Sequence, residues 1–292
     1  MSGNKQVSNA AYKNPSRIIG IQFGMSSPEE IRKAGVVEVV SKDTYVGNKE
    51  VPGGLFDPRM GVLGPGSICP TDGLTYIQTP GYFGYIEMAR PVFFIQHIKE
   101  IMKILKCVCF KCSKLLINKD DHKHVLEMNS YKRWDYVYPL CQNVKRCGEL
   151  TESGCGCKQP DKIKLEDMAT INASWGNLVN ESENMSMILS AEIVLKIFKR
   201  ISDEDVEFMG FSATWSRPDW MICQVLPVAP PSVRPSVKMD ANQRSEDDLT
   251  NIYGHIIKTN KDLADRISSG TVSPELINKL TTVLQYYVAM IV

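Results

Sequence analysis

The nine cysteines of this 292-residue chain are the residues best able to do chemistry, and they are unevenly placed. Seven of them lie between residues 107 and 157: Cys107, Cys109, Cys112, Cys141, Cys147, Cys155 and Cys157. Cys109 and Cys112 form a Cys-x-x-Cys pair, the usual way in which one loop offers two thiolates to tetrahedral zinc. The odd total, behind an N-terminus without the apolar stretch of a signal peptide, favours reduced thiols in a soluble, non-secreted chain. The pattern predicts a metal site.

The second pair of ligands must come from later residues, and the spacing alone leaves several choices. The candidates are the four later cysteines of the same segment: Cys141, Cys147, Cys155 and Cys157. His122 and His124 are spaced to supply one ligand, but the thiols already outnumber the need. Buried free thiols are the default reading of Cys69, Cys107, Cys141, Cys157 and Cys223.

Two kinds of chemistry at the Cys109–Cys112 pair are disfavoured. A thioredoxin-like redox pair stands at the start of a helix in a βαβ unit, whereas this pair follows a predicted helix. A catalytic zinc needs an open coordination position and a general base, and no residue is spaced to supply them. The site is therefore expected to be structural.

Positive charge is concentrated around the same cysteines. The whole chain has a net charge of only +1. Residues 93–146 hold nine lysines and two arginines against five acidic residues, a net charge of +6. Lys99, Lys103 and Lys106 recur on one face of a predicted helix, so they can present charge to a phosphate backbone together. The alternative is a solvated surface whose charge offsets the thiolates.

The elements that must position these groups follow from hydrophobic periodicity, turn residues and caps. The composition, 43% hydrophobic and 23% charged, is that of a globular protein, and no apolar run is long enough to span a membrane. Helices are predicted at 28–34, 90–106, 191–202, 203–209, 246–268 and 274–290, with Ser27, Ser190, Ser202 and Ser273 as N-caps. Strands are predicted at 18–24 and 35–47, a loop at 51–84, and a rigid proline-rich segment at 226–237. The last helix lacks a polar tail, so we expect it to dock on another chain or the sequence to continue past Val292.

Several sequence blocks, in order, resemble the largest subunit of cellular multisubunit RNA polymerases. The clearest is PGYFGYIEMARPVFF; the others are QFGMSSPEEIRKAGV, GGLFDPRMG, CVCFKCSKLLIN, GCGCKQP, FSATWSRPDWMICQVLPVAPPSVRPSV and NQRSEDDLTNIYGHIIKTN. Together they span residues 18 to 288. The chain is most similar to the eukaryotic RNA polymerase II type, and its divergence suits a large DNA virus as well as a cell.

The resemblance implies an α+β fold: a mixed helical and short-strand clamp core with an inserted zinc-binding lobe. The implied order is a flexible N-terminus at 1–17 and an N-terminal clamp segment at 18–92. A basic zinc-binding lobe at 93–160 and a helical clamp core at 161–292 follow. The clamp of this family closes over template DNA and the RNA–DNA hybrid during transcription.

The resemblance also implies which cysteines hold zinc. The family's clamp zinc maps onto Cys109, Cys112, Cys147 and Cys155, with Cys157 as the substitute for Cys155. A second zinc site of the family is degenerate here, because its four ligand positions read Cys69, Asp72, Thr79 and Tyr82. We therefore expect one structural zinc. We expect the loop 61–84 to be held instead by packing of its aromatic residues: Tyr76, Tyr82, Phe83 and Tyr85.

No catalytic residue is expected in this chain. The aspartate loop that holds Mg²⁺ in the complete polymerase is absent, and Glu246, Asp247 and Asp248 are better explained as charges at a helix start. The implied partners are the second-largest subunit, the remainder of the largest subunit, smaller subunits, template DNA and the hybrid. The implied location is the nucleus if the protein is cellular, or the virion or host cytoplasm or nucleus if it is viral. The alternative is a stand-alone zinc-stabilised nucleic-acid-binding or scaffold protein.

Overall fold

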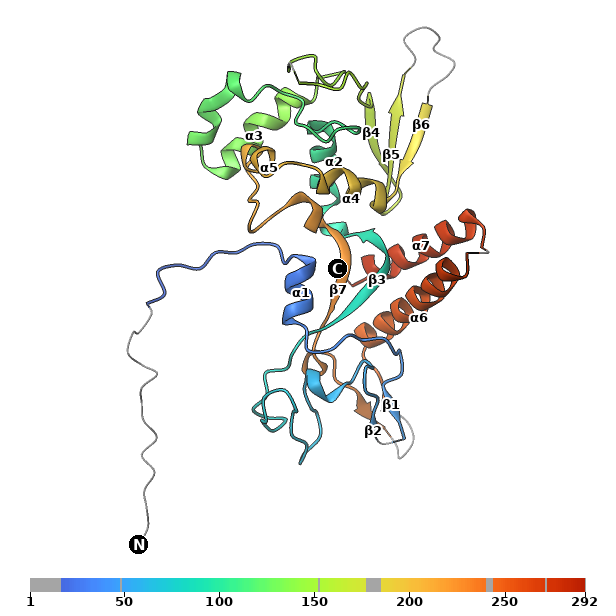
Figure 1. Ribbon diagram of the computed structural model, residues 1–292. Helices are drawn as coiled ribbons and strands as arrows, with labels where there is room; N and C mark the ends of the chain where they lie inside the picture. The colour runs from blue at the N-terminus through green and yellow to red at the C-terminus, as the bar shows by residue number, and fades with distance from the viewer. Residues whose placement is uncertain are drawn as a thin grey trace.

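The computed structural model describes residues 17–47, 49–151, 153–176, 185–239, 244–270 and 272–291. Its fold is α+β, as predicted, with helices and short strands mixed along the chain (Figure 1). The helices are α1 (Pro28–Ala34), α2 (Ile98–Cys107), α3 (Ser130–Cys141), α4 (Ala191–Lys199), α5 (Asp203–Phe208), α6 (Asp248–Ser269) and α7 (Pro274–Ala289). The strands are β1 (Tyr45–Val46), β2 (Lys49–Glu50), β3 (Gly84–Phe93), β4 (Lys162–Glu166), β5 (Thr170–Trp175), β6 (Met185–Leu189), β7 (Ile222–Val228), β8 (Val237–Lys238) and β9 (Arg244–Ser245). Every described helix is too short or too polar to cross a lipid bilayer.

The antiparallel pair β3–β7 runs through the middle of the molecule (Figure 1). Its register starts at Gly84 opposite Val228 and ends at Phe93 opposite Ile222, with an irregularity between Glu87 and Val92. Because β7 covers one edge of β3, the polar groups of the other edge need partners elsewhere. Residues 37–39 lie along that edge, where Val39 N donates to Tyr85 O at 2.8 Å.

Where β3 is irregular, a side chain makes the hydrogen bonds that a neighbouring strand would otherwise make with its second edge. Asn260 of α6 accepts from Ala89 N with Oδ1 and donates to Glu87 O with Nδ2, each at 2.8 Å. The amide thus offers one acceptor and one donor, as a neighbouring strand would. This contact ties α6 to the central pair of strands.

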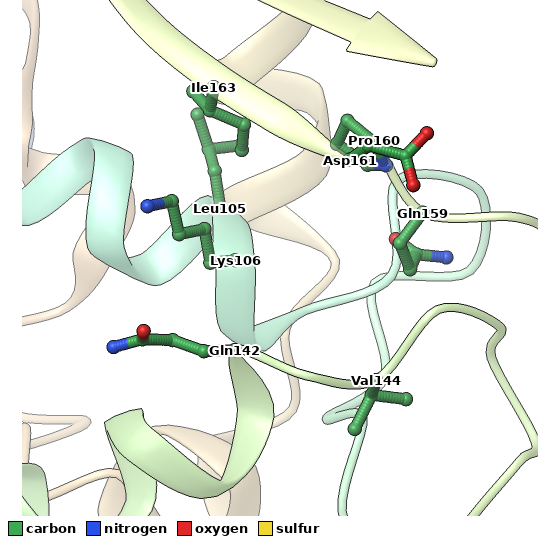
Figure 2. A pocket seen from close by; sticks show the side chains of 8 residues that line it. All are labelled: Leu105, Lys106, Gln142, Val144, Gln159, Pro160, Asp161 and Ile163. Atoms are coloured by element: carbon green, nitrogen blue, oxygen red, sulfur yellow. The ribbon is translucent and has the colours of Figure 1, made fainter. Parts of the chain in front are cut away.

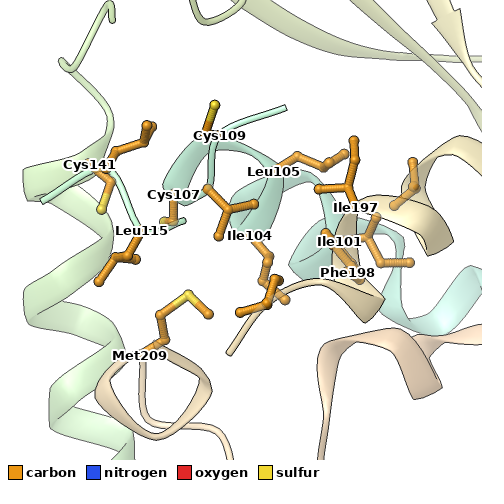
Figure 3. Packing of buried hydrophobic residues seen from close by; sticks show 14 of the residues in the cluster. Ile101, Ile104, Leu105, Cys107, Cys109, Leu115, Cys141, Ile197, Phe198 and Met209 are labelled. Atoms are coloured by element: carbon orange, nitrogen blue, oxygen red, sulfur yellow. The ribbon is translucent and has the colours of Figure 1, made fainter. Parts of the chain in front are cut away.

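The buried apolar residues form two clusters, one on either side of the junction at Phe93. The first extends from Phe93 to Ile222 and contains the buried faces of α2, α4 and β5 together with Cys107, Cys109 and Cys141 (Figure 3). The second joins residues 37–92 to residues 223–288. The sheet β4–β5–β6 and the cysteine-rich segment therefore share one core. The four-part division of the chain stays a prediction.

The helix starts predicted from capping residues are confirmed, although Ser273 precedes α7 without a side-chain capping bond. Ser27 Oγ accepts from Glu30 N at 3.1 Å, and Glu30 Oε2 accepts from Ser27 N at 2.9 Å, which is a reciprocal capping box. Ser190 and Ser202 cap α4 and α5 in the same position. Asp247 caps α6 by accepting from Leu249 N at 2.9 Å, so its carboxylate acts as the capping charge that we expected.

Three predictions of extended or helical structure are wrong. The helix expected from Arg90 begins at Ile98, because Val92 and Phe93 pair with Cys223 and Ile222 of β7. Residues 18–24 form no strand: Gly24 lies against Trp215, but no ladder of backbone hydrogen bonds joins the segment to another described part of the chain. Within 35–47 only β1 and a single bridge at Glu38 are strand-like. The sheet β4–β5–β6 was not predicted at all.

Candidate metal centre

Four cysteine sulfurs converge where two loops meet. The Sγ atoms of Cys109, Cys112, Cys147 and Cys155 all lie within 4.8 Å of one another. The Sγ atoms of Cys109 and Cys155 are 3.5 Å apart, and those of Cys112 and Cys147 are 3.6 Å apart. A tetrahedral zinc with bonds of about 2.3 Å separates its sulfurs by about 3.8 Å. The four cysteines named from the resemblance are thus brought together, and their spacing suits a metal ion.

The first loop leaves the C-terminus of α2 and turns back on itself within a few residues. Cys109 N donates to Lys114 O at 2.9 Å, and Ser113 N donates to Cys109 O at 2.8 Å. Val108 and Leu115 then form a β-bridge. The turn requires a positive φ of 61° at Ser113, a conformation that costs an L-residue energy. This turn places the sulfurs of Cys109 and Cys112 on one side of the loop.

The second loop brings Cys147 and Cys155 together across a pair of glycines. A Cβ atom added to Gly154 would lie 2.1 Å from Gly148 Cα, so only glycine permits this approach. Cys147 N donates to Cys157 O at 3.0 Å, which closes the loop. The thiol of Cys157 points elsewhere, to Lys158 O at 3.6 Å, and the metal-capable group therefore includes Cys155 and not its substitute.

Gln159 joins the two loops and was missed by sequence reasoning. Its side chain is buried, accepts from Phe110 N at 3.2 Å, and donates to Cys157 O at 2.9 Å and to Cys109 Sγ at 3.4 Å. The residue lies inside the block GCGCKQP, which was the available signal. A buried amide with contacts to both loops fixes their relative position and stabilises negative charge on the Cys109 sulfur.

The pKa values of two thiols in the group are shifted in opposite directions, because the sulfurs lie close together and cannot all ionise easily. Burial raises the pKa of Cys109, but hydrogen bonds from the backbone N–H groups of Cys112 and Lys111 outweigh it and lower the pKa to about 7. Burial and the neighbouring thiols raise the pKa of Cys147 to about 12. One thiolate therefore forms easily and opposes ionisation of the next. A divalent cation at the centre removes this conflict, since it stabilises all four thiolates.

The three lysines predicted to bind phosphate lie in different surroundings. Lys99 is exposed on α2. Lys103 Nζ lies 5.8 Å from the ring centroid of Tyr138 in α3, a cation–π contact. Lys106 lines a cavity of about 210 Å³ together with Gln142 and Asp161 (Figure 2). Nucleic-acid binding by these residues stays a prediction, and Lys99 is the one of the three that is exposed.

Polar contacts, and not the expected aromatic packing, hold the loop that follows Gly61. Tyr76 and Phe83 are 40% and 52% exposed, so they cannot form its core. Tyr82 donates its hydroxyl to Asp72 Oδ2 at 3.0 Å, and Thr79 donates to the same oxygen at 2.8 Å. The packing hypothesis is wrong because the loop has too little buried apolar surface.

Comparison with known proteins shows which family the chain belongs to. Residues 15–292 match the family described as RNA polymerase Rpb1, domain 1. The chain is also 38% identical, over 286 residues, to DNA-directed RNA polymerase II subunit RPB1 of Euplotoides octocarinatus. This alignment covers 93% of the chain and 58% of that relative, so the chain spans a little over half of the relative's length. The chain belongs to the RNA polymerase Rpb1 domain 1 family, the N-terminal region of the largest subunit of DNA-directed RNA polymerase.

Proposed function

We propose that this chain acts as the clamp of a DNA-directed RNA polymerase, holding template DNA and the RNA–DNA hybrid in the cleft during transcription. The proposal rests on the family match over nearly the whole chain and on the 38% identity to a subunit of RNA polymerase II. It assigns a binding and positioning role to the chain. Nucleotidyl transfer, which requires carboxylates that hold Mg²⁺, belongs to other parts of the complex.

One structural zinc is the cofactor that we propose for the four-cysteine group. The observation that carries this assignment is the mutual approach of four sulfurs to within 4.8 Å. When bound, zinc would join the two cysteine loops and neutralise their thiolates. The chain's own residues do the rest: Gln159 and the backbone N–H groups of Lys111 and Cys155 donate to the sulfurs and orient them.

The proposed nucleic-acid contact is electrostatic and carries no sequence readout. It is supported by the net charge of +6 between residues 93 and 146 and by the exposed position of Lys99. The proposed partners are the second-largest subunit, the remainder of the largest subunit and smaller subunits. For a cellular polymerase II homologue the proposed location is the nucleus.

Affinity purification of the tagged chain, with metal analysis of the product, tests the proposal. We expect the second-largest subunit to co-purify, together with close to one zinc per chain. Cys112→Ser should bring zinc towards zero, whereas Cys157→Ser, a matched change of a thiol outside the group, should leave it unchanged. Recovery of the chain alone with its zinc intact would instead favour a stand-alone zinc-stabilised nucleic-acid-binding or scaffold protein. Equal zinc loss in both variants would contradict the assignment of Cys112.

A further inference from the structure

Two loops of this chain have the same backbone conformation although only one carries the four-cysteine group. In the loop Cys109–Leu115, Cys109 N donates to Lys114 O at 2.9 Å and Ser113 N donates to Cys109 O at 2.8 Å. In the loop Cys69–Thr75, Cys69 N donates to Leu74 O at 2.9 Å and Gly73 N donates to Cys69 O at 2.8 Å.

The two loops also agree in how their ends are joined and in the residue that has a positive φ. A β-bridge closes each loop, between Val108 and Leu115 in one and between Ile68 and Thr75 in the other. The fifth residue has a positive φ in both, 61° at Ser113 and 72° at Gly73. The backbone around Cys69 is therefore that of a metal-binding Cys-x-x-Cys turn.

The side chains around Cys69 form a different centre. The residue three positions after Cys69 is Asp72, where the other loop has Cys112. Asp72 Oδ1 accepts from Leu74 N at 2.9 Å, and its Oδ2 accepts from the hydroxyls of Thr79 and Tyr82 at 2.8 and 3.0 Å. Cys69 is fully buried beside this carboxylate and donates to Pro58 O at 3.7 Å. Four side chains thus meet at one point, as ligands do around a metal.

These four side chains do not suit zinc. They offer one thiol and one carboxylate, whereas structural zinc takes four ligands drawn from thiolate, imidazole and carboxylate groups. Both hydroxyls already donate their protons to Asp72, and this hydrogen bond raises the pKa of Tyr82. Burial alone would raise the pKa of Asp72. Hydrogen bonds from Leu74 N, Thr79 and Tyr82 outweigh burial and lower it.

We propose that the loop Cys69–Tyr82 is a zinc knuckle without zinc, in which a carboxylate and its hydrogen-bond donors take the place of the metal. Asp72 supplies the central negative charge, and the two hydroxyls and Leu74 N satisfy it. The loop stays attached to its surroundings through Thr71, which donates to Arg59 O at 2.6 Å, and through Tyr82 N, which donates to Met60 O at 2.8 Å. Its conformation is therefore independent of metal supply.

The geometry predicts that three substitutions would return a metal site to this loop. In Asp72→Cys/Thr79→Cys/Tyr82→His, Cys69 gains two thiols and one imidazole on a backbone that already has the knuckle conformation. Zinc per chain should rise from one to two, measured by elemental analysis after gel filtration. Added Co²⁺ should show the thiolate-to-metal absorption of a second tetrahedral site. The matched control Asp72→Cys/Thr79→Ser/Tyr82→Phe, which has only two thiols, should stay at one. A folded triple variant that also stays at one would overturn the proposal.

A second set of variants keeps the proposal testable if the triple variant fails to fold. Asp72→Ala should leave zinc content unchanged while the Leu74 amide exchanges its hydrogen at least about tenfold faster, because the loop loses its central acceptor. Cys69→Ser should also leave zinc unchanged. Loss of one zinc in either variant would show that this loop holds metal. Because Cys112→Ser reports on the other loop, failure of the proposed zinc centre and failure of this inference are distinguishable.

Discussion

Gln285 pairs with both backbone polar groups of Phe93, although 192 residues separate them. Gln285 Oε1 accepts from Phe93 N at 2.6 Å, and its Nε2 donates to Phe93 O at 2.9 Å. Asn260 makes the equivalent pair of bonds with Ala89 N and Glu87 O. Two amides, one from each helix of the α6–α7 hairpin, thus stand in for the strand that β3 lacks on this edge.

Removing the Gln285 amide should destabilise the chain. Gln285→Met keeps the length of the side chain but leaves the N–H and C=O of buried Phe93 without partners, which should lower the free energy of unfolding by about 1–3 kcal/mol. Chemical denaturation measures this change. Lys279→Met, a change at an exposed position on the same helix, is the control and should cost less than about 0.5 kcal/mol. Equal effects in both variants would mean that the Phe93 contact adds nothing specific.

Exchanging the positive-φ residues of the two equivalent loops should change the stability of the chain in opposite directions. Ser113 has a φ of 61°, and its buried Oγ has no hydrogen-bond partner among the described residues. Ser113→Gly should therefore stabilise the chain by roughly 1 kcal/mol, because glycine adopts this conformation without strain. Gly73→Ser should destabilise it by a similar amount for the same reason. Thermal unfolding of the zinc-loaded chain measures both, and changes of the same sign would contradict the equivalence of the loops.

The contribution of Asp57 to stability should depend on pH. The side chain is almost wholly buried, and it accepts from Gly53 N at 2.6 Å and from Arg59 Nη2 at 2.7 Å. Burial raises the pKa of Asp57, but the hydrogen bonds from Arg59 and Gly53 outweigh it and lower the pKa in the folded state. The unfolded chain then takes up this proton at a higher pH than the folded chain does, so acid favours unfolding.

The measurement is the difference in unfolding free energy between the wild type and Asp57→Asn. It should be about 1–3 kcal/mol at neutral pH, where the carboxylate is ionised in both states. It should shrink as the pH falls below about 4 and through the folded pKa, because a protonated Asp57 resembles asparagine. Asp43→Asn, a change to an exposed carboxylate, is the matched control. A difference that stayed constant down to pH 3 would contradict the role of the charge.

Among the three lysines of α2, Lys99 should contribute most to DNA binding by the assembled polymerase. Its ammonium group is exposed, whereas Lys103 contacts Tyr138 and Lys106 lines the cavity beside Gln142. Lys99→Gln should lower the slope of log affinity against log salt by about one unit, the value of one phosphate contact. Lys123→Gln, an exposed lysine paired with Asp120, is the control. An unchanged slope when all three α2 lysines are replaced would show that they contact solvent and no phosphate.

Local sequence determined the features that depend on residues close together in the chain. Ser27 and Glu30 specify the start of α1, because caps act within one turn, and Pro274 specifies the start of α7, because its fixed φ suits the first helical position. The Cys109–Cys112 pair could be recognised from the sequence because its two cysteines are also close together in the chain. The choice of Cys155 over Cys157, by contrast, came from the resemblance, since spacing alone allowed both.

Only the tertiary structure decided which segments become strands and which side chains meet at Asp72. Residues 90–93 have a pattern that a helix could share, but pairing with β7 makes them extended, and β7 lies 129 residues further along the chain from Phe93. The segment 18–24 has strand-forming residues but no ladder of hydrogen bonds to another described segment, so it forms no strand. Thr79 and Tyr82 carry no local sign that they bind a carboxylate. The bonds between β3 and β7 join residues far apart in the chain, whereas those at Asp72 join residues seven and ten positions apart across an irregular loop, so both sets exist only once the chain has folded.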